Sequence, residues 1–268
     1  MVWSIGIDIG SVASKGVIAR DNKLLAYYVI PSGTNYRAVA HKLKQELLEQ
    51  VGLSSVEIVG IGATGCGASN VDFANLQISD IVCCAKGIKT VFPLVRTVIN
   101  IGGQCSQVIQ IDDEGRVADF AVTEKCAAGS ARFLQVIANV LRVDLKDIGP
   151  LSLKSKNPVS FSTGCAVFGE TEAVTRVAEG FSKEDILAGV YKSLADKIVS
   201  LVAKVRLEEQ CAISGGGGLD IGLVKSLEEK LQVPLLVPPQ PQIITALGAA
   251  VITQEKQKKR SNLKIRRR

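Results

Sequence analysis

The spacing of apolar residues predicts strands and helices that alternate along the chain. Ile5, Ile7 and Ile9 alternate with smaller or polar residues, which is typical of a strand, and Gly10 ends the run. Further strands are predicted at 17–19, 24–30, 56–61, 211–214 and 235–237. Apolar residues recur at helical spacing over 36–51, 80–91, 133–141, 186–205, 223–231 and 245–253. Alternating elements of both kinds predict an α/β fold.

The opening hairpin of the chain is repeated later in the sequence. Residues 7–18 align without a gap with residues 99–110, so that Gly10 matches Gly102. Each copy reads as a strand, a glycine turn and a second strand, and such a turn exposes backbone N–H groups that can hold phosphate oxygens. The duplication predicts two related lobes that present their turns to a shared cleft.

A glycine-rich stretch follows the predicted strand at 211–214. It contains Gly215, Gly216, Gly217 and Gly218, and a helical pattern begins shortly after it. Consecutive glycines allow a ligand to approach the backbone closely and leave amides free at a helix start. A flexible linker is the alternative interpretation, but the strongly patterned flanks do not favour it.

Two cysteines stand just before helical patterns. Cys126 precedes the helix predicted at 133–141, and Cys165 precedes a weaker pattern over 167–177. A thiolate at a helix N-terminus has a lowered pKa, which suits a metal or redox ligand. Two thiolates are too few for an iron–sulfur cluster, which usually takes four, but a two-fold dimer would supply two from each chain. The alternative is that both cysteines are inert core residues.

The other side chains with reactive potential have simpler interpretations. Cys83, Cys84 and Cys211 have apolar neighbours and are predicted to lie in the core, whereas loops carry Cys66 and Cys105, which are candidate reactive thiols. The chain has one histidine, so histidine-based triads and histidine-rich metal sites are excluded. No export-signal pattern opens the sequence, and no apolar run reaches the ~18–20 residues of a spanning helix. We therefore expect a cytoplasmic protein with reduced thiols and no membrane association.

The positive charge is concentrated at one end. Residues 255–268 hold eight Lys or Arg and one Glu, a net charge of +7, whereas the whole chain carries +6. The body is therefore close to neutral, and binding of nucleic acid or an acidic partner through the basic end is only a side hypothesis. The sequence predicts three parts: a first lobe at 1–95, a second lobe at 96–252 with the two cysteines and the glycine-rich loop, and a disordered basic tail at 253–268.

Together these features resemble a known superfamily. The two glycine-turn hairpins, the glycine-rich strand–loop–helix and a terminal helix of small residues are similar to the ATPases related to acetate kinase, sugar kinases, Hsp70 and actin. Cys126–Leu134 and Cys165–Glu172 narrow the resemblance to activators of 2-hydroxyacyl-CoA dehydratases and ATPase subunits of benzoyl-CoA reductases, the BadF/BadG/BcrA/BcrD type. Ile101–Gln104 resembles the second phosphate motif of that family, and Ala246–Ala250 its closing helix. The similarity spans residues 4–252.

The resemblance implies a duplicated, two-lobed ribonuclease H-like ATPase fold. It also implies a homodimer, or a heterodimer with a paralogous subunit, that holds one [4Fe–4S] cluster through Cys126 and Cys165 of each chain. ATP or ADP with Mg²⁺ would bind between the lobes, with Asp8 and Asn100 in catalytic positions. The implied nucleotide-binding residues are Gly10, Ser11, Ser14, Lys15, Gly102, Gly103, Gln104, Gly215, Gly216, Gly217 and Gln242.

The implied activity is ATP-dependent electron transfer. An upstream ferredoxin or flavodoxin-type donor would supply the electron, and an iron–sulfur acyl-CoA dehydratase or reductase would receive it at low potential. Nucleotide turnover can drive this transfer only if ATP binds the two cluster geometries with different affinity.

This chain departs from the family pattern in its second turn. Relatives usually carry Asp at the positions of Asn100 and Cys105, whereas Asp8 of the first turn is kept. A carboxylate at position 100 would hold a Mg²⁺-bound water, and Asn keeps an oxygen but loses the charge. The departure favours nucleotide binding over hydrolysis. The main alternative is therefore a nucleotide-binding, hydrolysis-poor subunit of a heteromeric complex; a small-molecule kinase is a further one.

Overall fold

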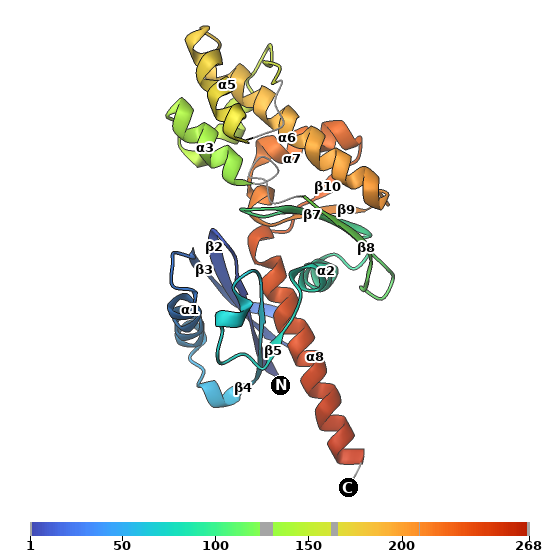
Figure 1. The fold of residues 1–268 in the computed structure, drawn as a ribbon. Coiled ribbons are helices and arrows are strands. Elements are labelled where there is room, and N and C mark those ends of the chain that lie inside the picture. The colour runs from blue at the N-terminus through green and yellow to red at the C-terminus, as the bar shows by residue number, and fades with distance from the viewer. Residues whose placement is uncertain (1, 124–130, 162–165, 209, 267–268) are drawn as a thin grey trace. The chain divides into compact units, whose positions relative to one another are not determined.

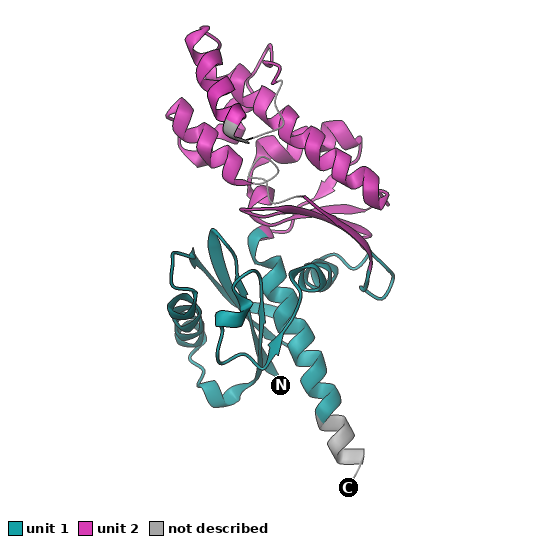
Figure 2. Ribbon diagram, in the orientation of Figure 1, with its two compact units in different colours: residues 1–94, 111–117, 242–268 teal, residues 95–110, 118–241 magenta. Residues whose placement is uncertain are grey.

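The computed structural model describes residues 2–123, 131–161, 166–208 and 210–266. The chain divides into two compact units (Figure 2). The first unit comprises residues 1–94, 111–117 and 242–268, and the second comprises 95–110 and 118–241. This division differs from the lobes predicted from the sequence in one main respect: the C-terminal stretch returns to the first unit, because its helix packs on the first sheet.

The first unit is built on a five-stranded sheet with the order β3-β2-β1-β4-β5 (Figure 1). The strands are β1 Trp3–Ile9, β2 Ala13–Arg20, β3 Lys23–Pro31, β4 Ile58–Thr64 and β5 Leu76–Gln77. β1, β2 and β3 form an antiparallel meander, whereas β4 runs parallel to β1. The helices of this unit are α1 Tyr36–Val51, α2 Asp80–Val91 and α8 Ile244–Arg266.

Both faces of this sheet are covered. Successive residues of a strand point to opposite faces. Ile18 of β2 joins a core cluster with Leu43 of α1, whereas its neighbours Val17 and Ala19 join a cluster with Ala246 of α8. The helices α1 and α8 therefore lie on opposite faces of the first sheet (Figure 1).

The helices α2 and α8 approach each other closely at two glycines. A Cβ atom at Gly87 would overlap the carbonyl oxygen of Ile244, and one at Gly248 would overlap that of Cys83. Backbone carbonyls cannot rotate away as a flexible side chain can, so only glycine allows this helix spacing. The close approach fixes α8 along the first unit.

Gly248→Ala is therefore expected to destabilise the protein by about 3 kcal/mol or more, because overpacking at a backbone contact forces elements apart. Denaturant unfolding measures the change. Gly216→Ala is the matched control, since a Cβ there would meet nothing within 4 Å and the residue has no left-handed φ. Equal unfolding midpoints for the two variants would contradict the close packing of α2 on α8.

The second unit contains a five-stranded sheet with the order β10-β9-β6-β7-β8. The strands are β6 Thr97–Ile101, β7 Ser106–Ile111, β8 Val117–Val122, β9 Cys211–Ser214 and β10 Leu235–Leu236. β6 pairs antiparallel with β7 and parallel with β9. It therefore has one antiparallel and one parallel neighbour, as β1 has in the first unit. The helices are α3 Ala131–Leu141, α4 Leu145–Ser152, α5 Ala166–Ala178, α6 Lys183–Val205 and α7 Ile221–Leu231.

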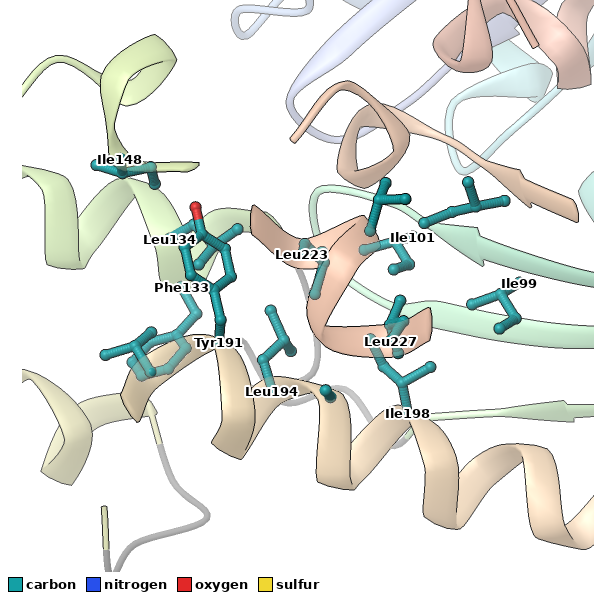
Figure 3. Packing of buried hydrophobic residues seen from close by; sticks show 14 of the residues in the cluster. Ile99, Ile101, Phe133, Leu134, Ile148, Tyr191, Leu194, Ile198, Leu223 and Leu227 are labelled. Atoms are coloured by element: carbon teal, nitrogen blue, oxygen red, sulfur yellow. The ribbon is translucent and has the colours of Figure 1, made fainter. Parts of the chain in front are cut away.

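The core of the second unit lies between its sheet and its helices (Figure 3). Side chains from β6, α3, α6 and α7 form one buried cluster, whose labelled members include Ile99, Phe133, Leu194, Ile198 and Leu227. The long helix α6 runs through this cluster and presents the apolar face that its sequence spacing predicts. None of the described helices is long and apolar enough to cross a membrane.

The C-terminal helix is longer than the sequence pattern indicates. The sequence predicts a helix that ends at Thr253 and a disordered basic tail after it, but α8 continues to Arg266. The physical reason lies in tertiary contacts at the start of the predicted tail. Thr253 and Gln254 are fully buried, and Gln254 Oε1 accepts a hydrogen bond from Asn22 N at 2.9 Å. Further along, the Lys258 ammonium lies 3.4 Å from Asp21 Oδ1.

Candidate functional site

The first glycine turn holds an ion pair at its base. Asp8 of β1 and Lys15 of β2 are cross-strand partners, and Lys15 Nζ donates to Asp8 Oδ2 at 2.9 Å. Asp8 is only 7% exposed, so the pair is largely shielded from water. A Cβ at Gly10 would lie 3.2 Å from Lys15 Nζ, which places the ammonium group beside the backbone of the turn. A cation beside exposed amides is suited to a phosphate group.

A serine directly after β3 fixes the shape of this turn. Ser32 Oγ donates to Gly10 O at 2.6 Å and lies 2.7 Å from Ser14 Oγ, which is buried. Ser32 N also donates to Val12 O at 3.0 Å. Ser14 therefore serves to hold the turn in this structure, and Ser11 lies half-buried at its tip.

The loop after β4 closes over the end of β1. Gly65 has a φ of +84°, and a Cβ there would overlap Asp8 Oδ1, so a side chain at this position is excluded. Cys66 Sγ donates to Ile9 O at 3.4 Å. Burial and the nearby Asp8 carboxylate raise the pKa of the Cys66 thiol. The structure therefore does not favour Cys66 as a reactive thiolate.

The second turn repeats this arrangement without its charges. Asn100 of β6 and Gln107 of β7 are cross-strand partners, and Asn100 Nδ2 donates to Gln107 Oε1 at 3.0 Å. Ser214 Oγ, from the end of β9, donates to Asn100 Oδ1 at 3.1 Å. Gly102 N donates to Cys105 O at 2.9 Å and closes the turn. A neutral hydrogen-bonded pair thus occupies the place of the Asp8–Lys15 ion pair.

The duplication extends to the parallel neighbour of each hairpin. Gly215 follows β9 as Gly65 follows β4; its φ is +79°, and its Cβ would lie 2.8 Å from Asn100 Oδ1. Thr64 and Ser214 occupy the same register beside Asp8 and Asn100. The internal repeat in the sequence reveals the two hairpins but not the parallel strand beside each of them. β4 follows its hairpin closely along the chain, whereas β9 lies about a hundred residues after its own.

The glycine-rich loop leads into α7. Asp220 caps this helix by accepting hydrogen bonds from Gly222 N at 2.9 Å and Leu223 N at 3.2 Å. Tyr191 O–H donates to Asp220 Oδ2 at 2.6 Å. Burial raises the pKa of Asp220, although the hydrogen bonds that the carboxylate accepts act against this shift. This hydrogen-bonded pair ties the end of the glycine loop to α6.

The glycines of this loop differ in what surrounds them. A Cβ at Gly217 would meet Ile101 Cβ at 2.6 Å, and Gly215 N donates to Pro241 O at 2.8 Å. The next residue after Pro241 is Gln242, which is half-buried in the 3₁₀ turn Pro241–Ile243. Gly216 alone among Gly215–Gly218 would place a Cβ in open space.

Gly216→Ala is expected to weaken nucleotide binding without changing the stability of the fold. A methyl group there occupies the space that a ligand lying along the loop backbone needs, but it meets no protein atom within 4 Å. Calorimetric titration with ATP and ADP measures the affinity, and denaturant unfolding serves as the control for stability. Unchanged affinity would contradict the role of this loop in nucleotide binding.

Within each unit, the structure gathers several of the residues predicted to bind nucleotide. The first unit brings Gly10, Ser11, Ser14 and Lys15 to one turn, next to Asp8. The second unit brings the turn residues Gly102, Gly103 and Gln104 and the loop residues Gly215, Gly216 and Gly217 to the ends of the adjacent strands β6 and β9. Gln104 is exposed and Gly103 is half-buried.

The two predicted cluster ligands, Cys126 and Cys165, lie outside the described residues. The helices that follow them in the chain are described, and their first turns are in contact: a Cβ at Gly169 of α5 would lie 2.8 Å from Phe133 Cζ of α3. Ala131 N, the first amide of α3, donates to Gly102 O at 3.0 Å. In the parts of the chain that the structure describes, no three His, Cys, Asp or Glu side chains form a group that could hold a metal.

Three of the other cysteines have the role that the sequence predicts. Cys83, Cys84 and Cys211 are buried, which confirms their place in the core. Burial raises the pKa of Cys83 and of Cys211 to about 12, so neither is a thiolate at neutral pH.

Comparison with known proteins identifies the family of this chain. The chain matches the BadF/BadG/BcrA/BcrD ATPase family over residues 5–253 and belongs to it. It is 36% identical over 267 residues to the 2-hydroxyisocaproyl-CoA dehydratase activator of Clostridioides difficile, covering 98% of this chain and 100% of the relative. It is 35% identical to the (R)-2-hydroxyglutaryl-CoA dehydratase activating ATPase of Acidaminococcus fermentans, over 95% of this chain and 98% of that one. The predicted family is confirmed.

Solved structures confirm the predicted fold class. The activator of the 2-hydroxyisocaproyl-CoA dehydratase from Clostridium difficile, solved with bound ADPNP, has a TM-score of 0.92, 35% sequence identity, and coverage of 97% of each chain. A ROK family glucokinase from Streptomyces griseus shares only the fold, with a TM-score of 0.57, 12% identity, and coverage of 94% of this chain and 99% of that one. The chain therefore has the two-lobed α/β fold of the actin, Hsp70 and sugar kinase ATPases.

Proposed function

We propose that this protein is an ATP-dependent electron-transfer activator. In this proposal it forms a dimer that holds one [4Fe–4S] cluster through Cys126 and Cys165 of each chain, and it delivers a low-potential electron to a 2-hydroxyacyl-CoA dehydratase or a benzoyl-CoA-reductase-type enzyme. The donor would be a ferredoxin or flavodoxin-type protein, and the location would be the cytoplasm. Membership of the ATPase family and the identity to dehydratase activators support this assignment.

The contact between α3 and α5 is the observation that supports the proposal most directly. These helices begin shortly after Cys126 and one residue after Cys165, and Gly169 allows the Phe133 ring to pack against the first turn of α5. A larger residue at position 169 would push the ring away. Two helix N-termini side by side are a favourable place for thiolates. A cluster bound there would supply a one-electron carrier of low potential.

The residues of the first turn are suited to ATP and Mg²⁺. Lys15 would neutralise phosphate charge, and the backbone of Gly10 and Ser11 would donate to phosphate oxygens. Asp8 has one carboxylate oxygen paired with Lys15, and the other faces the loop at Gly65. Carboxylate oxygens are ligands that Mg²⁺ accepts, directly or through water. Asp8 would thus orient the metal-bound water around the phosphates.

The test is the iron and acid-labile sulfide content of protein purified without oxygen, together with its oligomeric state. A cluster shared by two chains gives about two irons per chain in a dimer. A monomer without iron would overturn the proposed activator function and leave a nucleotide-binding fold.

The neutral pair in the second turn supports a second candidate function. Asn100 and Gln107 stand where the first turn has a carboxylate and an ammonium group, so the second turn lacks the charge that would assist attack on the γ-phosphate. The chain would then be a nucleotide-binding, hydrolysis-poor subunit of a heteromeric reductase or activator complex. Steady ATP turnover by the isolated protein would contradict this candidate.

A further inference from the structure

The second glycine turn is joined to the start of α3 by a backbone hydrogen bond. Gly102 O accepts from Ala131 N at 3.0 Å. The first amides of a helix have no acceptor within the helix itself. The amide of Ala131 therefore depends on an acceptor outside α3, and that acceptor belongs to the turn that is the candidate phosphate site.

A second connection joins the same turn to the end of β8. Thr123 N donates to Ser106 O at 2.9 Å, and Ser106 N donates to Thr123 Oγ1 at 2.9 Å. This reciprocal pair fixes the residue that follows the turn. Gly102 and Ser106, at the two sides of the turn, are thus held by Ala131 and Thr123, which stand at the two sides of residues 124–130.

The first hairpin shows that this connection is not a general requirement of the turn. Its equivalent carbonyl, Gly10 O, accepts from the Ser32 hydroxyl at 2.6 Å, and Ser32 itself contacts Ser14 in the same hairpin. The same carbonyl is therefore satisfied by a local side chain in one copy and by a helix amide in the other. Only the second arrangement makes the start of a helix depend on the shape of the turn.

We propose that the turn of Gly102–Cys105 is the point at which bound nucleotide is coupled to α3, with Thr123 as a positioning residue. The proposal rests on the proposed function and names the route of its regulation. A phosphate that engages the amides of the turn changes the position of the Gly102 carbonyl. The first turn of α3, the helix that follows Cys126, then responds because its leading amide is bound to that carbonyl.

Hydrogen exchange of the intact protein, resolved to single amides in 131–141, tests this coupling with and without saturating ADPNP. We expect ADPNP to change the exchange of the Ala131 amide in the wild type. Thr123→Val keeps the branched shape but removes the acceptor for Ser106 N, whereas Thr123→Ser keeps that acceptor. Thr123→Val should reduce the nucleotide-linked change about fivefold, the effect of losing one hydrogen bond, and Thr123→Ser should retain it.

A matched control comes from Ser32, which contacts the turn of the first hairpin. Ser32→Ala removes the local donor to Gly10 O, and we expect the response of α3 at saturating ADPNP to remain. An equal loss of response in Ser32→Ala would overturn the assignment to the second turn. A full response in Thr123→Val, or no response in a wild type that binds ADPNP, would overturn the coupling and leave the proposed function standing. No nucleotide binding by the wild type would overturn both.

Discussion

A Cys126→Ala variant is expected to purify folded but without iron. The proposed site takes Cys126 and Cys165 from each chain, so the variant dimer would retain two of the four thiolates that such a cluster usually needs. Metal binding is strong only when its ligand set is complete. Anaerobic purification followed by iron and sulfide analysis should give about two irons per chain for the wild type and none for the variant.

Cys66→Ala is the matched control for this experiment. Cys66 belongs to the first unit and is not one of the proposed ligands, and partial burial together with the Asp8 carboxylate raises the pKa of its thiol. We expect this variant to keep its iron. Cys165→Ala should behave as Cys126→Ala does. A Cys126→Ala protein that keeps the wild-type iron content would remove Cys126 from the site, and circular dichroism would show whether any loss comes from unfolding instead.

Local signals define the elements that the sequence predicts well. The bounds of α1 agree with the prediction, since Asn35 Oδ1 accepts from Ala38 N at 3.0 Å at its start and Gly52 adopts a left-handed φ of +65° at its end. The helix at 80–91 and the strand at 211–214 also agree with the structure. Apolar periodicity, caps and turns are properties of short stretches, so a single sequence records them.

The elements that the sequence analysis missed depend on contacts between distant residues. The helix α4, Leu145–Ser152, contains Pro150, a residue that usually argues against a helix. β8, Val117–Val122, is an edge strand with only exposed or half-buried residues, so it lacks the alternation that marks a strand with one buried face. The continuation of α8 beyond Thr253 depends on burial against the first sheet.

In the candidate site, too, the features that short motifs define are predicted from the sequence, and the contacts between residues far apart in the chain are not. The glycine turns and the glycine-rich loop follow from the sequence, because each is carried by a contiguous motif or by the internal repeat. The connections that shape the turns do not follow from it. Ser214 reaches Asn100 across 114 residues, and Ala131 reaches Gly102 from another element. No local pattern marks a residue whose partner is so far along the chain.

The two turns differ in the charge of the residue at the end of their first strand. In the first turn a carboxylate is paired with a lysine; in the second, Asn100 donates through Nδ2 to Gln107 and accepts through Oδ1 from Ser214. An aspartate at position 100 needs donors for both oxygens. Ser214 already supplies one, and rotation of the Gln107 amide by half a turn supplies the other. The second turn therefore accommodates a carboxylate without a new buried cation.

Asn100→Asp is accordingly expected to raise the rate of ATP hydrolysis by about a hundredfold. This is the lower end of the acceleration that a well-placed general base contributes. Turnover at saturating Mg-ATP measures it, with calorimetry to show that ADP affinity changes far less. Gln107→Glu is the matched control, because it adds the same charge on the neighbouring strand rather than at position 100. Equal acceleration by Gln107→Glu, or none by Asn100→Asp, would show that the missing carboxylate does not limit hydrolysis in this chain.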